Sequence, residues 1–123
     1  MYTLDTNAVI YYSRDDENAV TVLQEIFVQN TPLYISAITE IELFGFPRLS
    51  AEEMQWIENF LQAVTVIPVD SRIARTAGSI RRRYRLKTLD SAIAATALAT
   101  GTTLLTRNIK DFRNIPNLVV QKI

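Results

Sequence analysis

The sequence places four acidic residues where their side chains could act together on one substrate. Asp5 follows a short β-prone segment at the N-terminus, and Asp111 lies shortly after a second one near the C-terminus. Glu42 lies in a helical segment, and Asp90 opens an alanine-rich one. Carboxylates gathered at one place raise each other's pKa unless a cation neutralises them, because like charges repel. The acids therefore predict a metal site.

The cation at such a site would have oxygen ligands, because the chain contains neither histidine nor cysteine. Oxygen ligands favour Mg²⁺ or Mn²⁺ over zinc. A cation of this kind can bind phosphate oxygens and lower the pKa of a water molecule. The same absences exclude Ser-His-Asp triads and thiolate nucleophiles, and no glycine-rich nucleotide-binding loop is present. Catalysis would have to rely on carboxylates, Lys, Arg, hydroxyl groups or a bound metal.

A basic strip lies close to Asp90 in the sequence. Net charge is zero, yet seven of the thirteen basic residues lie between two aspartates with no acid among them. They are Arg72, Arg75, Arg81, Arg82, Arg83, Arg85 and Lys87. Such a strip favours contact with phosphates, although a solvated helix face has the same composition. The acids and the strip together predict metal-assisted hydrolysis of phosphodiester bonds in a polynucleotide.

The segments that must position these residues alternate between strands and helices. We predict strands at 2–4, 33–36, 64–69, 102–106 and 118–120. We predict helices at 8–12, after Asp15 or Asp16, from Ala37 or Ile38 to Phe44, at 51–62, from Asp70 or Ser71 through the arginines, and from Leu89 to Thr100. Apolar strands separated by helices are typical of a parallel sheet covered on both faces. The prediction is one domain, 1–123, with a three-layer α/β/α fold around a central, mostly parallel sheet.

Apolar periodicity predicts which helix faces are buried. In the 51–62 helix the apolar stripe consists of Met54, Ile57, Phe60 and Leu61, and in the arginine-bearing helix it consists of Ile73, Ala74, Ala77 and Ile80. The helix after Asp90 has small, uncharged residues all round, so we expect it to be buried. No apolar run could span a bilayer, and no signal-like segment opens the chain. We therefore expect a cytoplasmic protein with no membrane partner.

The predicted sheet would bring the acids to one edge. In open parallel sheets the site lies beyond the carboxyl ends of the strands, where the topology changes direction. Asp5 follows the first strand, and Thr106 and Asn108 follow the fourth. Each acid also has a structural alternative, since Asp5 and Asp90 could cap helices and Asn108 with Asp111 resembles a capping pair.

The inward-facing acid of the 37–44 helix could be Glu40 and not Glu42, because spacing alone does not distinguish the two. The acids would belong to no common site only if every one of these structural alternatives were true at the same time. A shared site is the simpler interpretation.

Four ordered motifs resemble those of the PIN-domain ribonucleases, above all the VapC-type toxins of toxin–antitoxin pairs. They are Leu4-Asp5-Thr6-Asn7, Ile38 to Leu43, Leu89 to Ala97, and Leu105 to Phe112. The resemblance covers essentially the whole chain. It implies an Mg²⁺- or Mn²⁺-dependent endoribonuclease that leaves a 5′-phosphate and a 3′-hydroxyl. It also implies a homodimer and a cognate antitoxin whose tail occludes the metal site.

The resemblance implies roles for individual residues. Asp5, Asp90 and Asp111 match the metal ligands, and Glu42 matches the acid that ligates or orients a water. The positions with supporting roles are Thr6, Thr106 and Asn108. Position 108 is an amide where many relatives carry a polar or acidic residue, so the fourth acid can only be Asp111. The residues expected to bind the RNA backbone are Arg81, Arg82, Arg83, Arg85 and Lys87.

The apolar residues Phe44, Phe46 and Trp56 look exposed in the sequence and favour the homodimer. Two rival interpretations remain. One is a catalytically silent PIN module that only binds RNA or an antitoxin. The other is a receiver-type phosphoacceptor domain with Asp70 at the end of the third strand, although a receiver needs an acidic pair where this chain has only Asp5.

Overall fold

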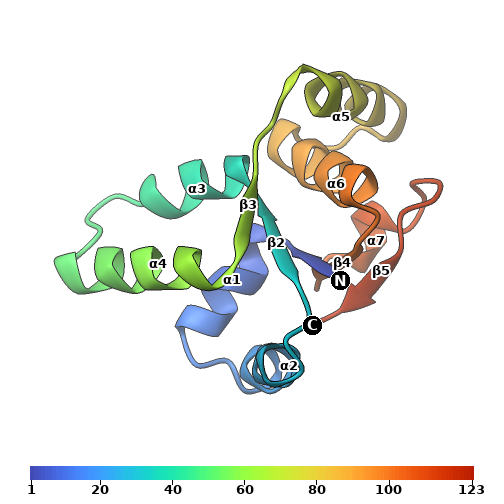
Figure 1. The fold of residues 1–123 in the computed structure, drawn as a ribbon. Coiled ribbons are helices and arrows are strands. Elements are labelled where there is room, and N and C mark those ends of the chain that lie inside the picture. The colour runs from blue at the N-terminus through green and yellow to red at the C-terminus, as the bar shows by residue number, and fades with distance from the viewer.

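A five-stranded parallel sheet in the order β3-β2-β1-β4-β5 runs through the computed structural model, which describes residues 1–123 (Figure 1). The strands are β1 (Tyr2–Leu4), β2 (Leu33–Ser36), β3 (Thr65–Ile67), β4 (Thr103–Thr106) and β5 (Val120–Lys122). Every neighbouring pair is parallel, and β1 pairs with β4 so that Leu4 lies opposite Leu105. The parallel sheet predicted from the sequence is confirmed.

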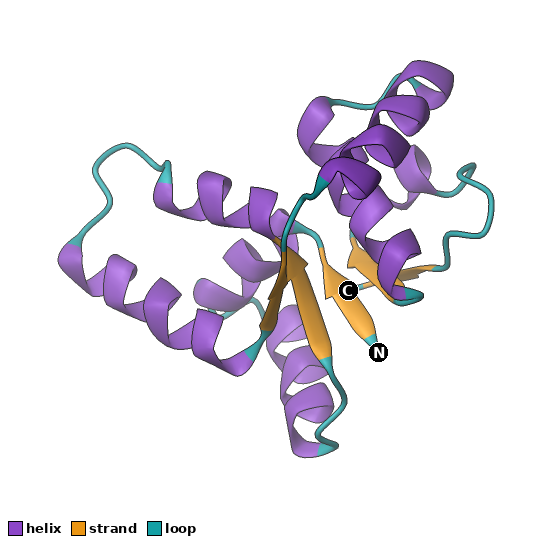
Figure 2. Ribbon diagram, turned by 45° about the horizontal axis from the view of Figure 1, so that its top comes forward, coloured by secondary structure: helices purple, strands orange, loops and turns teal.

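Helices cover both faces of the sheet (Figure 2). They are α1 (Thr6–Ser13), α2 (Glu17–Val28), α3 (Ala37–Phe44), α4 (Ala51–Ala63), α5 (Ser71–Tyr84), α6 (Thr88–Thr100) and α7 (Ile109–Phe112). Adjacent residues of β4 point to opposite faces, so Leu105 packs with apolar residues of α1 to α4 and Leu104 with those of α5 to α7. The three-layer α/β/α fold is therefore confirmed.

The strand order creates one point where the chain changes direction across the sheet. From β1 the chain moves outward through β2 to β3, and it then returns to the other side of β1 as β4. The carboxyl ends of β1 and β4 therefore flank the topological switch point, where open α/β sheets place their ligand sites. Asp5 follows β1 at this point, and Thr106 ends β4.

The helix α6 is the buried element that the sequence predicted. Its residues from Ser91 to Ala97 are all buried, and α5 packs along it. Gly101 ends the helix with a φ of 63°, a left-handed conformation that glycine adopts without steric cost. The position of Asp90 is thus set by the best-packed helix of the domain.

Several element boundaries differ from those predicted. β3 covers only Thr65–Ile67, because Pro68 has no backbone N–H with which to continue the ladder. β5 starts at Val120 because the chain first makes a turn at Asn117, whose φ is 67°. The sequence analysis missed α7, which has four residues and is too short to show a helical period.

Two residues assigned to apolar stripes are exposed, so these predictions were wrong. Met54 is 44% exposed, because the N-terminal part of α4 projects away from the sheet (Figure 1). Ala74 is exposed because α5 packs mainly against α6, and that narrow contact buries only Ile73, Ala77 and Ile80. None of the helices has the length and apolar character needed to cross a membrane.

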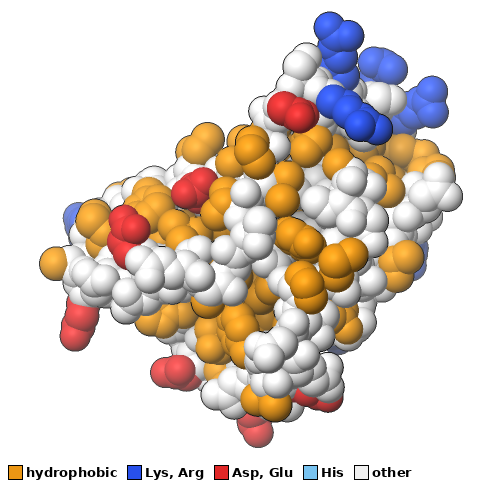
Figure 3. Space-filling model, viewed as in Figure 1, with side chains coloured by type: hydrophobic (Ala, Val, Ile, Leu, Met, Phe, Trp, Pro, Cys, Tyr) orange, Lys and Arg blue, Asp and Glu red, His pale blue; other side chains and the backbone are white.

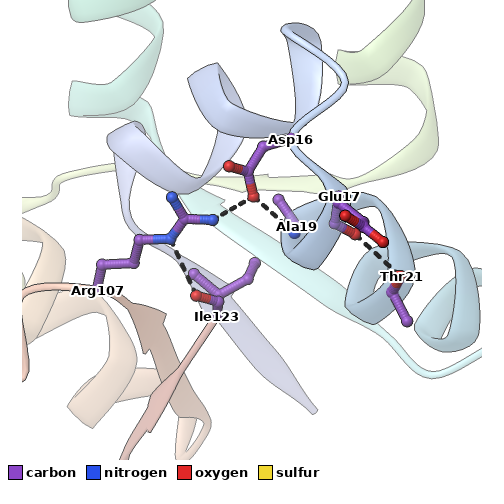
Figure 4. A network of polar contacts seen from close by, with 6 residues as sticks. All are labelled: Asp16, Glu17, Ala19, Thr21, Arg107 and Ile123. Carbon is purple, nitrogen blue, oxygen red and sulfur yellow. Dashed lines mark hydrogen bonds and ion pairs between the residues drawn. The ribbon is translucent and has the colours of Figure 1, made fainter.

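Arg107, directly after β4, connects three segments that are distant in the sequence (Figure 4). Its Nε–H donates to the carbonyl oxygen of Ile123 at 3.1 Å, and its guanidinium lies 4.0 Å from the centroid of the Tyr11 ring. It also forms an ion pair with Asp16, the N-cap of α2. The hydrogen bond from Arg107 lowers the pKa of Asp16.

We expect Arg107→Gln to lower the melting temperature more at neutral pH than in acid. Because the pKa of Asp16 is lowered in the folded state, the stability from this pair is present above the ordinary carboxyl pKa and is lost as the pH falls through the lowered value. Thermal unfolding at pH 7 and about pH 2 measures the difference. The control Arg14→Gln, at an exposed position, should show no such pH dependence. Equal losses at both pH values would contradict the prediction.

Candidate active site

Asp5 is a buried carboxylate at the switch point. It is 4% exposed and occupies the N-cap position of α1, but its side chain makes no capping hydrogen bond there. Its Oδ2 instead accepts a hydrogen bond from the Thr106 hydroxyl at 2.8 Å. Burial raises the pKa of Asp5, and the bond from Thr106 partly offsets this. The side chain therefore connects β1 to β4.

Thr106 holds Asp5 in place from the neighbouring strand. The Thr106 hydroxyl donates its proton to Asp5 and accepts the backbone N–H of Asn108 at 3.0 Å. Thr106 is itself fully buried, and its bond to Asp5 lies away from water, whereas the bond from the exposed Asn108 is only partly buried. The supporting role that the resemblance implied for Thr106 agrees with this geometry.

Replacing Thr106 with valine would keep the shape of the side chain and remove its hydroxyl. The buried Asp5 carboxylate would lose its donor, and the N–H of Asn108 would lose its acceptor. A buried polar group that loses its partner costs about 1–3 kcal/mol, and Asp5 is the buried one of the two, so we expect a clear loss in the free energy of unfolding. Urea unfolding measures it, and Thr103→Val on the same strand is the control. Equal stability of the two variants would contradict the prediction.

Glu42, on α3, is connected to the start of α1 through threonine hydroxyls. The Thr6 hydroxyl donates to Glu42 Oε1 at 2.6 Å, and Thr39 Oγ1 lies 3.0 Å from Thr6 Oγ1. Because the single proton of Thr6 goes to Glu42, Thr39 must donate to Thr6. Glu42, and not Glu40, makes this contact. The sequence analysis missed Thr39, although it lies three residues before Glu42 on the same helix face.

Asp90 is the third residue of α6, and the N-cap position belongs to Lys87. The alternative that Asp90 caps the helix is therefore wrong. Burial raises the pKa of Asp90, and the negative charges of Asp5 and Glu42 raise it further. Lys87 partly offsets these effects, and Asp111 adds a smaller increase. The charges of the other three predicted acids thus all reach Asp90.

Asp111 lies on α7 and is exposed, with its carboxylate held by a neighbour. Asn108 Nδ2 donates to Asp111 Oδ2 at 2.7 Å, while Asn108 occupies the N-cap position of α7 without making a side-chain cap. Asn108 and Asp111, predicted as a possible capping pair, therefore contact each other through their side chains and do not cap the helix. No three acidic side chains lie close enough together in the structure to surround one metal ion.

A cavity of about 310 Å³ opens beside Asp90 and Asp111. Its other lining residues are Tyr84, Arg85, Leu86, Lys87, Lys110, Arg113 and Asn114. Of the residues predicted to bind RNA, Arg85 and Lys87 line this cavity. Arg81, Arg82 and Arg83 lie exposed on the last turn of α5, where basic side chains gather in Figure 3. Lys110 and Arg113, near Asp111 in the sequence, also line the cavity and were not predicted from the basic strip, because they lie outside it.

The strand order excludes the receiver-type interpretation. In receiver-like doubly wound sheets β1 lies between β2 and β3, whereas here β1 lies between β2 and β4. β3 is an edge strand, so Asp70 is separated from Asp5 by β2. The Asp70 side chain accepts the backbone N–H of Ile73 at 2.9 Å and so caps α5. Asp70 therefore has a structural role as a helix cap.

Comparisons with known proteins show the family to which this fold belongs. The family model for the PIN domain matches residues 2–118. Ribonuclease VapC19 of Mycobacterium tuberculosis is 32% identical over 123 residues, which cover 96% of this chain and 97% of that protein.

Two solved structures share the fold over the full length. The structure of VapBC2 from Rickettsia felis, bound to a DNA fragment from its promoter, matches with a TM-score of 0.85 and 26% identity, over 99% of this chain and 98% of that one. A toxin–antitoxin complex from Klebsiella pneumoniae matches with a TM-score of 0.82 and 30% identity, over 100% of both chains. The chain therefore belongs to the PIN-domain family and, within it, to the VapC proteins.

Proposed function

We propose that this protein is a metal-dependent endoribonuclease toxin that acts in the cytoplasm, hydrolyses RNA phosphodiester bonds and is inhibited by a cognate antitoxin. The observation that carries the proposal is the buried Asp5 carboxylate, held by Thr106 at the switch point of the sheet, with Asp90 near enough for the charges of Asp5, Glu42 and Asp111 to raise its pKa. The relatives named as ribonucleases support the same activity.

The residues at this site fit a divalent cation with oxygen ligands. Asp5 is buried with a raised pKa, and the pKa of Asp90 is raised by burial and by other carboxylates, so positive charge would stabilise both ionised forms. We propose that Asp5, Asp90 and Asp111 would hold Mg²⁺ or Mn²⁺, for which these side chains must come closer together than they lie in the structure. When bound, the cation would polarise a phosphate oxygen and lower the pKa of a water.

The residues around the acids have separate roles in this mechanism. Thr106 orients Asp5, and Thr6 orients Glu42 through Oε1, which leaves Oε2 free to accept a proton from the attacking water. The water oxygen attacks phosphorus in line, the bond from phosphorus to the 3′ oxygen breaks, and that oxygen takes up a proton. The products are a 5′-phosphate and a 3′-hydroxyl.

The test is cleavage of a total RNA pool by antitoxin-free protein with and without Mg²⁺ or Mn²⁺, followed by sequencing of the new ends. We expect discrete cuts that need the cation and disappear in Asp5→Asn. Asp15→Asn is the matched control, since Asp15 is exposed and its φ of 58° suits asparagine. Absence of cutting by the metal-loaded protein would support the catalytically silent module. Equal cutting by wild type and Asp5→Asn would contradict the carboxylate mechanism.

We propose that the antitoxin occupies an apolar groove of about 450 Å³ between α1, α3 and α4. Its lining includes Leu43, Phe46, Leu49, Trp56 and Ile57. The matched solved structures are described as toxin–antitoxin complexes or VapBC assemblies, which supports a protein partner. Phe46→Glu should abolish co-purification with the co-expressed antitoxin and leave RNA cleavage intact. Undiminished co-purification would contradict this location.

The homodimer stays a proposal. Phe46 is 42% exposed, but Phe44 and Trp56 are partly buried, and Trp56 stacks on Phe60 with ring centroids 5.3 Å apart. The expectation that all three are exposed was therefore wrong, because Phe44 and Trp56 pack against the core and are partly buried there. Light scattering at micromolar concentration tests the dimer, and a monomer mass would contradict it.

A further inference from the structure

We propose that the cavity beside Asp90 and Asp111 is a subsite for one nucleotide, binding the phosphate and base of the RNA nucleotide next to the cleaved bond. The proposal rests on the proposed function and deepens it. The cavity combines four basic side chains, one aromatic ring and two of the predicted catalytic acids. Its volume of about 310 Å³ is at the lower end of the range for small-ligand sites and suits a single nucleotide.

The basic side chains come from two separate parts of the chain. Arg85 and Lys87 belong to the connection between α5 and α6, and Lys110 and Arg113 belong to α7 and the residue after it. The four cations outnumber the two carboxylates that line the same cavity, so its lining carries a net positive charge that suits an anionic ligand. Asp90 and Asp111 line the same cavity, so the anion must be bound directly beside the acids. A phosphate of the substrate backbone satisfies both requirements.

Arg85 has a backbone conformation that is unusual for its residue type. It ends α5 with φ 56° and ψ 38°, in the left-handed region where glycine is the usual residue. Arg48, which lies outside the cavity, has the same left-handed conformation with a φ of 63°, so this conformation is not special to the cavity. The case for Arg85 rests on its guanidinium lining the cavity beside Asp90 and Asp111.

Tyr84 supplies the surface for the base. It lines the cavity beside Arg85 and is half-buried. Stacking of a base on an aromatic ring tolerates any sequence and adds to phosphate binding. By contrast, Arg81, Arg82 and Arg83 do not line the cavity. We infer that they contact phosphates further along the RNA, outside the nucleotide subsite.

The test measures binding separately from cleavage. Full-length Asp5→Asn is titrated into a short fluorescein-labelled single-stranded RNA, and fluorescence anisotropy is recorded across a range of salt concentrations. In this background, Lys110→Gln/Arg113→Gln should weaken binding about tenfold and flatten the dependence of log K on log salt by about one unit. The charge-matched control is Arg48→Gln/Lys122→Gln, whose residues are exposed and lie outside the cavity. It should keep the original affinity within about twofold.

The aromatic contribution has its own pair of variants. Tyr84→Leu should weaken RNA binding about tenfold, and Tyr84→Phe should retain it, because the ring and not the hydroxyl stacks on the base. Unchanged affinity and salt slope in the Lys110/Arg113 variant would overturn the subsite. If the wild type cleaves RNA and the cavity variants bind RNA as tightly as their background, the nuclease function stands and only the subsite is contradicted. If the wild type binds RNA through the cavity and never cleaves it, the proposed nuclease function is contradicted and the subsite is retained.

Discussion

Asp90→Asn is expected to reduce RNA cleavage about a thousandfold while leaving the fold intact. The substitution removes one of the charges that would hold the cation, and a loss of several kcal/mol in transition-state stabilisation corresponds to a rate change of that size. Stability should not fall, because burial and neighbouring carboxylates already raise the pKa of Asp90 and disfavour its ionised form. The measurements are kcat/KM on a cleaved RNA and the circular dichroism spectrum.

Asp70→Asn is the matched control for this prediction. Asp70 also follows a strand and precedes a helix, but its side chain caps α5, and asparagine retains the oxygen that accepts the N–H of Ile73. We therefore expect Asp70→Asn to cleave RNA like the wild type. Cleavage by Asp90→Asn at the wild-type rate would contradict the proposed carboxylate mechanism. Loss of activity in both variants would indicate that the change of charge acts at long range.

Local signals in the sequence were sufficient for most of the fold. The bounds of β1, β2 and α3 agree with the prediction, because capping residues and prolines lie at their ends. Ser36 caps α3 by accepting the N–H of Ile38, and Pro32 precedes β2. The parallel topology followed from the alternation of strands and helices. These features depend on residues only a few positions apart.

Features that depend on distant residues were beyond the reach of sequence patterns. The Thr106 hydroxyl contacts Asp5 although 101 positions separate the two residues, and only the pairing of β1 with β4 brings them together. The same applies to the cavity, where Lys110 and Arg113 join Arg85 and Lys87. The basic strip suggested phosphate binding, but packing decided which of its residues lie beside the acids.

Asp5→Asn is expected to abolish cleavage and at the same time to stabilise the fold. Burial raises the pKa of Asp5, so its ionised form at neutral pH is held at a cost in folding free energy. Asparagine keeps an oxygen that can accept the Thr106 hydroxyl and carries no charge. We expect the free energy of unfolding at pH 7 to rise by about 1 kcal/mol, a typical gain when a functional site is relieved of strain.

The pH dependence gives the sign of this effect. Below the ordinary carboxyl pKa, Asp5 is protonated in both folded and unfolded chains and costs nothing. As the pH rises through the raised pKa of the folded state, the folded protein binds more protons than the unfolded chain, so the wild type loses stability. The advantage of Asp5→Asn should therefore grow with pH over this window. Urea unfolding at several pH values measures it, with Asp15→Asn as the control.

Addition of Mg²⁺ should reverse the order of stability. A cation that binds only the folded state stabilises it in proportion to the logarithm of its concentration over the dissociation constant. The wild type retains the buried carboxylate that would hold the cation and should gain stability, whereas Asp5→Asn should not. A variant less stable than the wild type at neutral pH without Mg²⁺ would mean that ionised Asp5 supports the fold. The cost of burying this charge would then be compensated by the protein alone, and the case for a cation at this position would lose its physical basis.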